Sequence, residues 1–265
     1  MQCKSPSIAP NRVPSRDSAW LVALILLAYV VLLVVGEAVL VWVGPIPSVV
    51  VHSVLLLVLL NHYAFSGRDK HQGALLALCL VPLLRILSLT MSFPKVPPSA
   101  WIVFAEAPLI VGMIAVIRIT GLSLNVLRMR RDGLLLQVLI ALAGIPLSFL
   151  GLVVMHPAVP IVADRGWQSL SSAVAVLALS ALVEECLFRF VLPHTLSSTF
   201  GAYSVLPCTL LFASTYLGSL SPAYVLFAGF TGLLFGLCVH RTRSLWGVIA
   251  AHGLIGASFV LFAPG

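Results

Sequence analysis

The chain is a succession of apolar stretches, each close to the length of about 20 residues that a helix needs to cross the hydrocarbon core of a membrane. Of its residues, 60% are hydrophobic and only 9% are charged, whereas soluble domains carry about 25% charged residues. A soluble fold of this composition could not cover its surface, which excludes a cytosolic globular enzyme, a nucleic-acid binder and a disordered protein. The sequence therefore predicts an all-α fold, a polytopic transmembrane helix bundle.

Glycine and proline clusters divide these stretches and set the limits of about eight or nine expected spans. The polar segment 1–18 precedes an apolar run longer than a signal-peptide core, so we expect that run to be retained as the first span. The second expected span is rather short and ends in a His-Tyr pair. The nine spans are 19–43, 48–65, 73–92, 100–117, 134–155, 169–192, 203–218, 223–240 and 245–262.

The distribution of positive charge predicts the orientation of these spans. With a cytoplasmic N-terminus, twelve Lys and Arg residues fall at the inner side, Lys95 and Arg165 fall outside, and Arg85 lies within a span. Cytoplasmic segments of membrane proteins carry such an excess of Lys and Arg. The net charge of +7 is thus explained by orientation in a bilayer rather than by nucleic-acid binding. We expect a multi-pass protein of the cell membrane.

Charges inside the expected spans are few, and each is a candidate functional residue because a charge at mid-bilayer is costly. Glu37, Arg85 and Glu106 are interpreted as a buried ion pair that locks the N-terminal helices, with a substrate-carboxylate or proton site as the alternative. The remaining candidates lie further along the chain: Glu184, Glu185 and Arg189 in the sixth span, and His252 in the ninth.

The sixth span contains two adjacent acids, which is unusual for an apolar helix. Glu185 and Arg189 are four residues apart and can face each other as an ion pair, while Glu184 points about 100° away on the helix. One acid is then neutralised and the other faces a different surface. A purely structural cluster would not require this second, unpaired acid, so Glu184 is a candidate general base for water.

The stretch ALVEECLFRFVLP resembles the EExxxR motif of the CPBP family of intramembrane proteases, which includes CAAX prenyl endopeptidases and bacteriocin-processing and self-immunity proteins. LPCTLLFASTYLG occupies the place of the second motif, FxxxH. GLLFGLCVHRTRSLWGVIAAHGLIG is similar to the final helix pair with the third motif, HxxxN or HxxxD. The resemblance covers roughly residues 170–260. It divides the chain into a cytoplasmic tail (1–18), N-terminal helices with a basic cytoplasmic loop (19–133) and a CPBP-like transmembrane core (134–265).

The resemblance implies a membrane endopeptidase whose cavity opens to the cytoplasm. Glu184 would activate the hydrolytic water, Glu185 and Arg189 would be its motif companions, and His252 would donate to the oxyanion. The second motif begins at Phe212 but ends in Tyr216 instead of His. We expect Tyr216 to substitute for the histidine.

The third motif has Gly256 in place of Asn. Together with Phe212, Gly256 is a candidate substrate-binding residue. No HExxH is present and few metal ligands lie near Glu184, so neither a metal nor a cofactor is expected.

These features predict an intramembrane endopeptidase that acts on peptides or lipidated C-termini delivered from the bilayer. Because the second and third motifs are altered, a non-proteolytic relative that binds a membrane partner is the first alternative. A small-solute transporter is the second, although the sequence lacks the matching broken segments that are typical of transporters.

Overall fold

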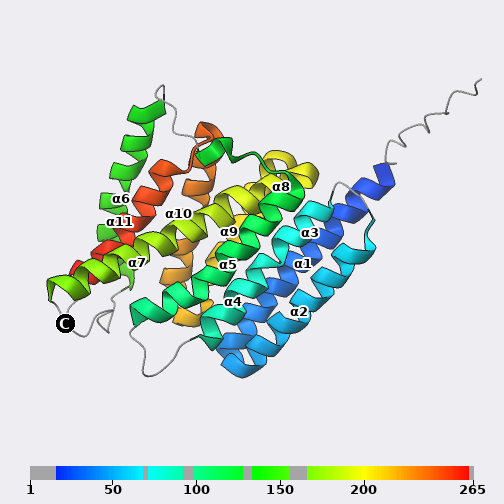
Figure 1. Cartoon of the computed structure of the whole chain (residues 1–265), viewed down its shortest axis with the longest axis horizontal. Helices are drawn as coiled ribbons and strands as arrows, with labels where there is room; N and C mark the ends of the chain where they lie inside the picture. Colours follow the sequence, from blue (N-terminus) through cyan, green and yellow to red (C-terminus); the bar gives the residue numbers. More distant parts are fainter. Residues whose placement is uncertain (1–15, 68–70, 92–97, 128–132, 156–165, 263–265) are drawn as a thin grey trace, which may run out of the picture.

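The computed structural model describes residues 16–67, 71–91, 98–127, 133–155 and 166–262. Every secondary-structure element in these ranges is a helix, in agreement with the predicted all-α class (Figure 1). Most of the predicted tail 1–18 lies outside the described residues, as do the predicted outer charges Lys95 and Arg165. Six described helical segments are long and apolar enough to span a membrane: Ala19–Trp42, Pro45–Phe65, Gln72–Thr90, Ile102–Thr120, Leu134–Val154 and Pro222–Thr242. The chain is therefore multi-pass, while the total of eight or nine spans stays a prediction.

Five N-terminal helices pack side by side on one side of the molecule (Figure 1). Gly44 connects the first two with a φ of 120°, which glycine adopts without strain, and Pro45 opens the second helix at a position where its missing N–H costs nothing. A short 3₁₀ helix, η1 (Leu124–Leu127), follows the fifth. The five helices are α1 (Arg16–Trp42), α2 (Pro45–Phe65), α3 (Gln72–Leu78), α4 (Leu80–Thr90) and α5 (Pro98–Thr120).

The predicted span 73–92 consists of two helices, α3 and α4, which are separated at Cys79. Pro82, one turn into α4, has no N–H to donate to the carbonyl of Leu78. The Cys79 N–H still donates to Leu75 over 3.2 Å, and Leu83 donates to Cys79 over 3.3 Å, so the chain stays helical across the break.

The C-terminal part forms the other side of the bundle, with α6 and α11 furthest from α1 and α2 (Figure 1). A 2.7 Å hydrogen bond from the Gly247 N–H to Oε1 of Gln137 joins α6 to the start of α11. The elements are α6 (Leu134–Met155), α7 (Trp167–Glu185), η3 (Cys186–Val191), α8 (Leu192–Phe200), η4 (Gly201–Ser204), α9 (Val205–Ser214), η5 (Leu217–Ser219), α10 (Pro222–Thr242) and α11 (Trp246–Phe262).

The helix of the predicted sixth span, 169–192, continues to Phe200, because α7, η3 and α8 follow one another without a break. η3 is a turn of π-helix in which Leu192 donates its N–H to the carbonyl of Leu187, five residues earlier. Pro193 cannot donate to Arg189, which favours the wider turn. The helix ends at Gly201, where φ is 56°.

The seventh predicted span, 203–218, is wrong in its extent. Its α-helix, α9, ends at Ser214 and has ten residues, which gives it a length of about 15 Å, half the thickness of the hydrocarbon core. Tyr216 therefore lies in a turn beyond the helix rather than inside a span. α11, with 17 residues, is also short for a span.

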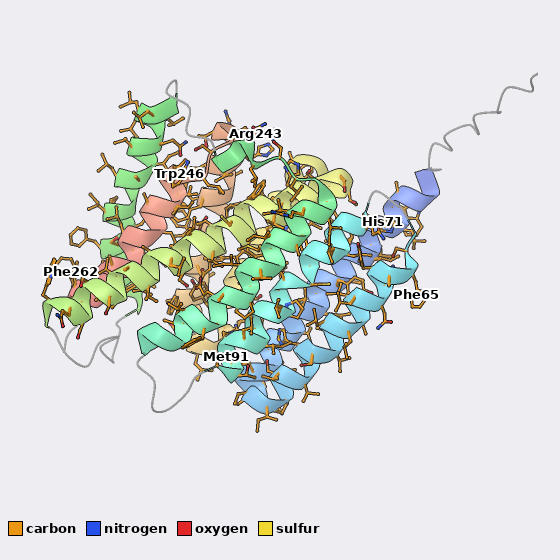
Figure 2. The ribbon with its side chains drawn as sticks, in the orientation of Figure 1. Phe65, His71, Met91, Arg243, Trp246 and Phe262 are labelled. Carbon is orange, nitrogen blue, oxygen red and sulfur yellow. The ribbon has the colours of Figure 1, made fainter. Side chains whose placement is uncertain are left out.

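The helix ends alternate between two sides of the molecule (Figure 2). His71, before α3, and Arg243, after α10, lie toward one side, whereas Met91, after α4, and Phe262, at the end of α11, lie toward the other. This is the alternation that the predicted spans require. Which side faces the cytoplasm stays a prediction.

Candidate active site

A cavity of about 190 Å³ lies between α7, the end of α9, α10 and α11. Five of the residues singled out from the sequence line it: Glu184, Phe212, Tyr216, His252 and Gly256. Much of the rest of its wall is aromatic and was not foreseen, because these residues belong to none of the motifs. The additional aromatic side chains are Tyr224, Phe227, Phe235 and Phe259.

Glu184 presents its carboxylate to this cavity, with 26% of its side chain exposed. The Tyr216 hydroxyl donates to its Oε2 over 3.5 Å, a long hydrogen bond. Nε2 of His252 lies 4.0 Å from the same oxygen. Two groups from two other parts of the chain therefore converge on one carboxylate oxygen of Glu184.

Glu185 is engaged on both of its oxygens and is fully buried. Its Oε2 lies 3.2 Å from Nε of Arg189, which confirms the predicted ion pair. Its Oε1 lies 2.8 Å from Nδ1 of His252, a contact that the sequence did not predict. The two adjacent acids are thus separated as expected: Glu185 is neutralised, and Glu184 faces the cavity.

The guanidinium of Arg189 is covered by an aromatic ring. Its central carbon lies 3.9 Å from the ring centroid of Phe212, a cation–π contact. Nη1 and Nη2 of Arg189 have no hydrogen-bond partner among the described residues. Phe212 therefore both covers the arginine and lines the cavity.

His252 is held in one orientation by its neighbours. Its Nδ1 is hydrogen-bonded to the Glu185 carboxylate, so Nδ1 carries a proton and Nε2 is the nitrogen directed toward Glu184. The Phe212 ring meets the imidazole edge-on, with centroids 6.1 Å apart and planes at 89°. A histidine whose far nitrogen is fixed by a carboxylate is the arrangement by which proteins orient catalytic imidazoles.

The ends of two helices place the residues around the cavity. Ser221 caps α10 by accepting a hydrogen bond from the Tyr224 N–H over 3.3 Å, and Pro222 occupies the first helical position. This brings the Tyr224 ring within 5.1 Å of the Tyr216 ring, centroid to centroid. Tyr216 itself lies in a turn that follows α9, and its N–H donates to the carbonyl of Ala213.

The three charges in the N-terminal spans are arranged differently from the sequence-based interpretation. Glu37 and Arg85 form the expected buried pair, with Nε to Oε1 at 2.7 Å. Glu106 does not join it: the carboxylate accepts a hydrogen bond from Ser180 of α7. Ser180 in turn lines the cavity, one helical turn before Glu184.

Within the described ranges, no group of three or more His, Cys, Asp and Glu side chains is arranged to hold a metal ion. Glu185 and His252, two neighbours of Glu184 that could ligate a metal, are bound to each other.

Residues 166–258 match the family model described as Type II CAAX prenyl endopeptidase Rce1-like. The matched segment begins just before α7 and ends within α11, so it contains all seven site residues that the motifs predicted. The predicted resemblance is thereby confirmed. Neither the curated proteins nor the solved structures contain a match to the chain.

Proposed function

We propose that the chain cleaves peptide bonds with water activated by Glu184, since residues 166–258 match the Rce1-like family of type II CAAX prenyl endopeptidases. The observation that carries the proposal is the convergence of Tyr216 and His252 on Oε2 of Glu184 in one cavity. A cluster that only stabilised the helices would neutralise this acid, as Arg189 does for Glu185.

Glu184 is the general base of the proposed reaction. At about 30 Å³ for each molecule, several waters fit into the cavity beside its carboxylate. Glu184 takes a proton from one of them as the water oxygen adds to the scissile carbonyl carbon. The carboxylic acid then returns that proton to the amine nitrogen as the C–N bond breaks, so the Glu184 carboxylate is regenerated.

Tyr216 and His252 stabilise the negative oxygen that forms on the carbonyl. Both are directed at the space in front of Glu184, and the Tyr216 hydroxyl is a hydrogen-bond donor throughout. When the imidazole carries both protons, its Nε2–H is the second donor, because Nδ1 is already used by Glu185. One such donor is worth about 3 kcal/mol of transition-state stabilisation.

The substrate presents an apolar segment to the aromatic wall of the cavity. A volume of about 190 Å³ is smaller than the roughly 300–1,000 Å³ of a site that encloses a whole small molecule. The cavity therefore accommodates a few side chains next to the scissile bond, while the rest of a peptide or of a lipidated C-terminus stays outside it. Such a substrate reaches the cavity from the bilayer.

The proposal is tested with the purified protein reconstituted in vesicles that carry a library of membrane-tethered peptides. Mass spectrometry of the products reports whether an internal peptide bond is hydrolysed and on which side of apolar residues. Vesicles that contain the Glu184→Gln protein serve as the matched control. We expect products with the wild type and none above background with the control.

A folded wild-type protein that yields no product from the library contradicts the proposal and favours the non-proteolytic relative. Equal amounts of product from the wild type and from Glu184→Gln contradict only the role of Glu184 as the base, not the cleavage of peptides.

A further inference from the structure

The N-terminal helices lie outside the segment that matches the protease family, yet one of their side chains reaches the turn that carries Tyr216. We propose that Arg85 is a positioning residue for the active site: it holds the end of α9 and thereby aims the Tyr216 hydroxyl at Glu184. This inference rests on the proposed function. The residues concerned, Glu37, His52, Arg85 and Thr215, are called the α9 clamp below.

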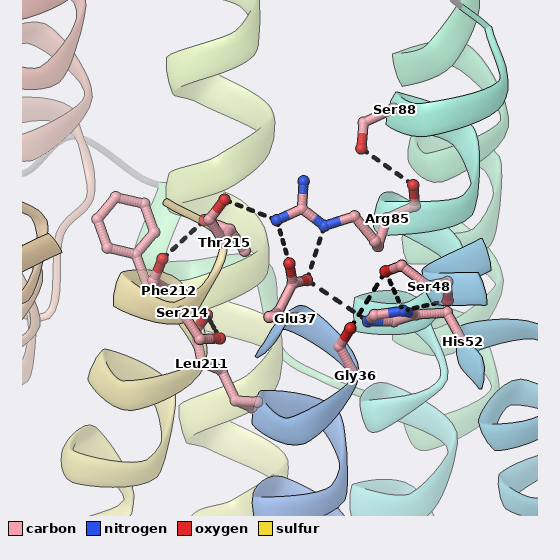
Figure 3. A network of polar contacts seen from close by, with 10 residues as sticks. All are labelled: Gly36, Glu37, Ser48, His52, Arg85, Ser88, Leu211, Phe212, Ser214 and Thr215. Atoms are coloured by element: carbon pink, nitrogen blue, oxygen red, sulfur yellow. Dashed lines mark hydrogen bonds and ion pairs between the residues drawn. The ribbon is translucent and has the colours of Figure 1, made fainter. Parts of the chain in front are cut away.

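Arg85 uses its guanidinium to join three helices (Figure 3). Nε donates to Oε1 of Glu37 on α1 over 2.7 Å, and Nη2 donates to the other oxygen of the same carboxylate. Nη2 also donates to the backbone carbonyl of Thr215 over 2.6 Å. Arg85 comes from α4 and Thr215 directly follows α9, so this last bond crosses from the N-terminal helices to the family segment.

The bond to Thr215 satisfies a need of the α9 terminus. The last carbonyls of a helix have no partner inside it, and the aligned peptide dipoles leave partial negative charge there. The carbonyls of Phe212 and Ala213 accept from the N–H groups of Thr215 and Tyr216. The Thr215 carbonyl is taken by Arg85, a cation at the negative end of the helix.

The partners of Arg85 fix its position. The Glu37 carboxylate is 2% exposed and lies 3.4 Å from Nε2 of His52, which is itself fully buried on α2. Nδ1 of His52 is in turn 2.9 Å from the Ser48 carbonyl. A simple ion pair between α1 and α4 would need only Glu37 and Arg85. The further bond to Thr215 indicates that Arg85 also holds the end of α9.

The turn beyond α9 is held from a second direction by α1. A Cβ placed on Gly218 would come within 3.0 Å of Cδ2 of Leu40, so the backbone of η5 and this leucine are in close contact. Tyr216 lies between these two points of attachment, Thr215 and Gly218. Its hydroxyl meets Glu184 at the limit of hydrogen-bond distance, 3.5 Å. A small shift of the turn would therefore break the contact.

The test removes the clamp without leaving a buried charge. Arg85→Met alone would strand Glu37, so the variant is Glu37→Met with Arg85→Met, since apolar replacement of a buried pair is often tolerated. The control is Tyr29→Phe, which removes the 2.9 Å contact of Tyr29 with His62 between α1 and α2, a contact that involves no residue of α9.

Two readouts are made on the full-length protein. The first is hydrogen exchange of residues 213–220 in detergent, which needs no activity. We expect exchange there to accelerate by about tenfold or more in the double variant, the factor that the loss of one charge-assisted hydrogen bond allows, and not in Tyr29→Phe. The second is cleavage: kcat should fall about tenfold with KM unchanged, because the turn and not the substrate is displaced.

The link to Tyr216 is tested by a double-mutant cycle with Tyr216→Phe. If the clamp acts through the tyrosine hydroxyl, its removal in the Tyr216→Phe background costs little further activity. Losses that multiply, or exchange that stays at the wild-type rate, overturn the positioning role. If the wild type cleaves nothing, the proposed function is contradicted instead. The hydrogen-exchange result then decides whether the clamp holds α9.

Discussion

Glu184 and Glu185 are neighbours in the chain but have opposite surroundings, because consecutive side chains leave a helix about 100° apart. Glu185 points to Arg189 and His252 and is fully buried. Glu184 points to the cavity and keeps 26% of its side chain exposed. This division could be predicted from the sequence, since it depends only on helix geometry and on the spacing to Arg189.

Replacement of Glu185 is expected to affect stability as well as activity. Glu185→Gln leaves the buried Arg189 without its counter-charge, and the loss of one partner of a buried pair costs about 3–5 kcal/mol. Thermal unfolding in detergent should show a Tm several degrees below the wild type. Glu184→Gln, at a partly exposed position, is the control and should change the Tm little. An unchanged Tm in Glu185→Gln would show that the ion pair does not stabilise the fold.

Tyr216 and Gly256 are expected to limit the rate of cleavage. The double change Tyr216→His with Gly256→Asn restores the residues of the family motifs and should raise kcat by tenfold or more, because it adds an imidazole and an oxyanion donor. A Cβ at Gly256 would meet Cβ of Leu177 at 3.4 Å, an ordinary van der Waals distance, and Gly256 lines the cavity. Single-turnover assays of the wild type, both single variants and the double variant measure the effect. A double variant that folds and cleaves more slowly than the wild type contradicts this explanation.

At the level of the elements, the sequence predicts where helices occur better than where they kink, widen or end. Apolar length and the Gly and Pro clusters locate most helices, but the helix of the sixth predicted span continues past 192 and ends only at Gly201. The break at Cys79 and the π-turn η3 follow from Pro82 and Pro193. A proline inside an apolar run does not by itself say whether the helix kinks, widens or stops, since neighbouring helices decide how the freed carbonyl is satisfied. The early end of α9 could not be predicted for the same reason: Arg85, which caps it, is 130 residues away.

The close packing of α6 against α11 is expected to tolerate no side chain at Gly144. A Cβ there would lie 2.7 Å from Cα of Ala251, a backbone atom that cannot move without α11. Gly144→Ala should therefore lower the Tm and, because His252 follows Ala251, the cleavage rate.

Gly229→Ala on α10 is the matched control for this change. Its Cβ would meet only Cβ of Ala213 at 3.7 Å, so the usual helix preference for Ala over Gly, up to about 1 kcal/mol, should leave it neutral or slightly stabilised. Thermal unfolding of both variants decides the matter. Equal Tm values for the two variants would mean that α6 and α11 do not depend on this contact.

At the scale of the molecule, the structure consists of the segment that matches the protease family and an N-terminal set of helices that packs against it. The sequence predicts the Glu37–Arg85 pair because buried charges need partners. It does not predict that Glu106 bonds to Ser180, since a glutamate in one span and a serine in another give no pairing signal. Contacts between distant segments depend on how the helices pack, and periodicity and charge do not specify that packing.

The orientation of the bundle is open to a direct test with a membrane-impermeant maleimide. In a Cys3→Ser background, we expect His71→Cys and His240→Cys to be labelled from the cytoplasmic side and Thr90→Cys from the opposite side, since Arg-rich segments stay inside. Labelling of intact cells against inverted vesicles distinguishes the two sides. The reverse pattern contradicts the cytoplasmic N-terminus, and labelling of Thr90→Cys and His240→Cys from one side contradicts the arrangement of the spans.

The central claim is that Glu184 is the base that activates water, and the most direct measurement compares it with Glu106, a second glutamate that accepts a hydroxyl hydrogen bond. Glu184 and Glu106 each accept a hydrogen bond from one hydroxyl, of Tyr216 and Ser180 respectively, but only the Glu184 carboxylate lines the cavity. In single-turnover cleavage of a membrane-tethered peptide, Glu184→Gln should lower the rate by roughly 10²–10⁴-fold, the range for loss of a general base. Glu106→Gln should stay within about threefold of the wild type, because an amide oxygen can still accept from Ser180. Near-normal cleavage by Glu184→Gln, or an equal loss in both variants at unchanged Tm, would contradict the account.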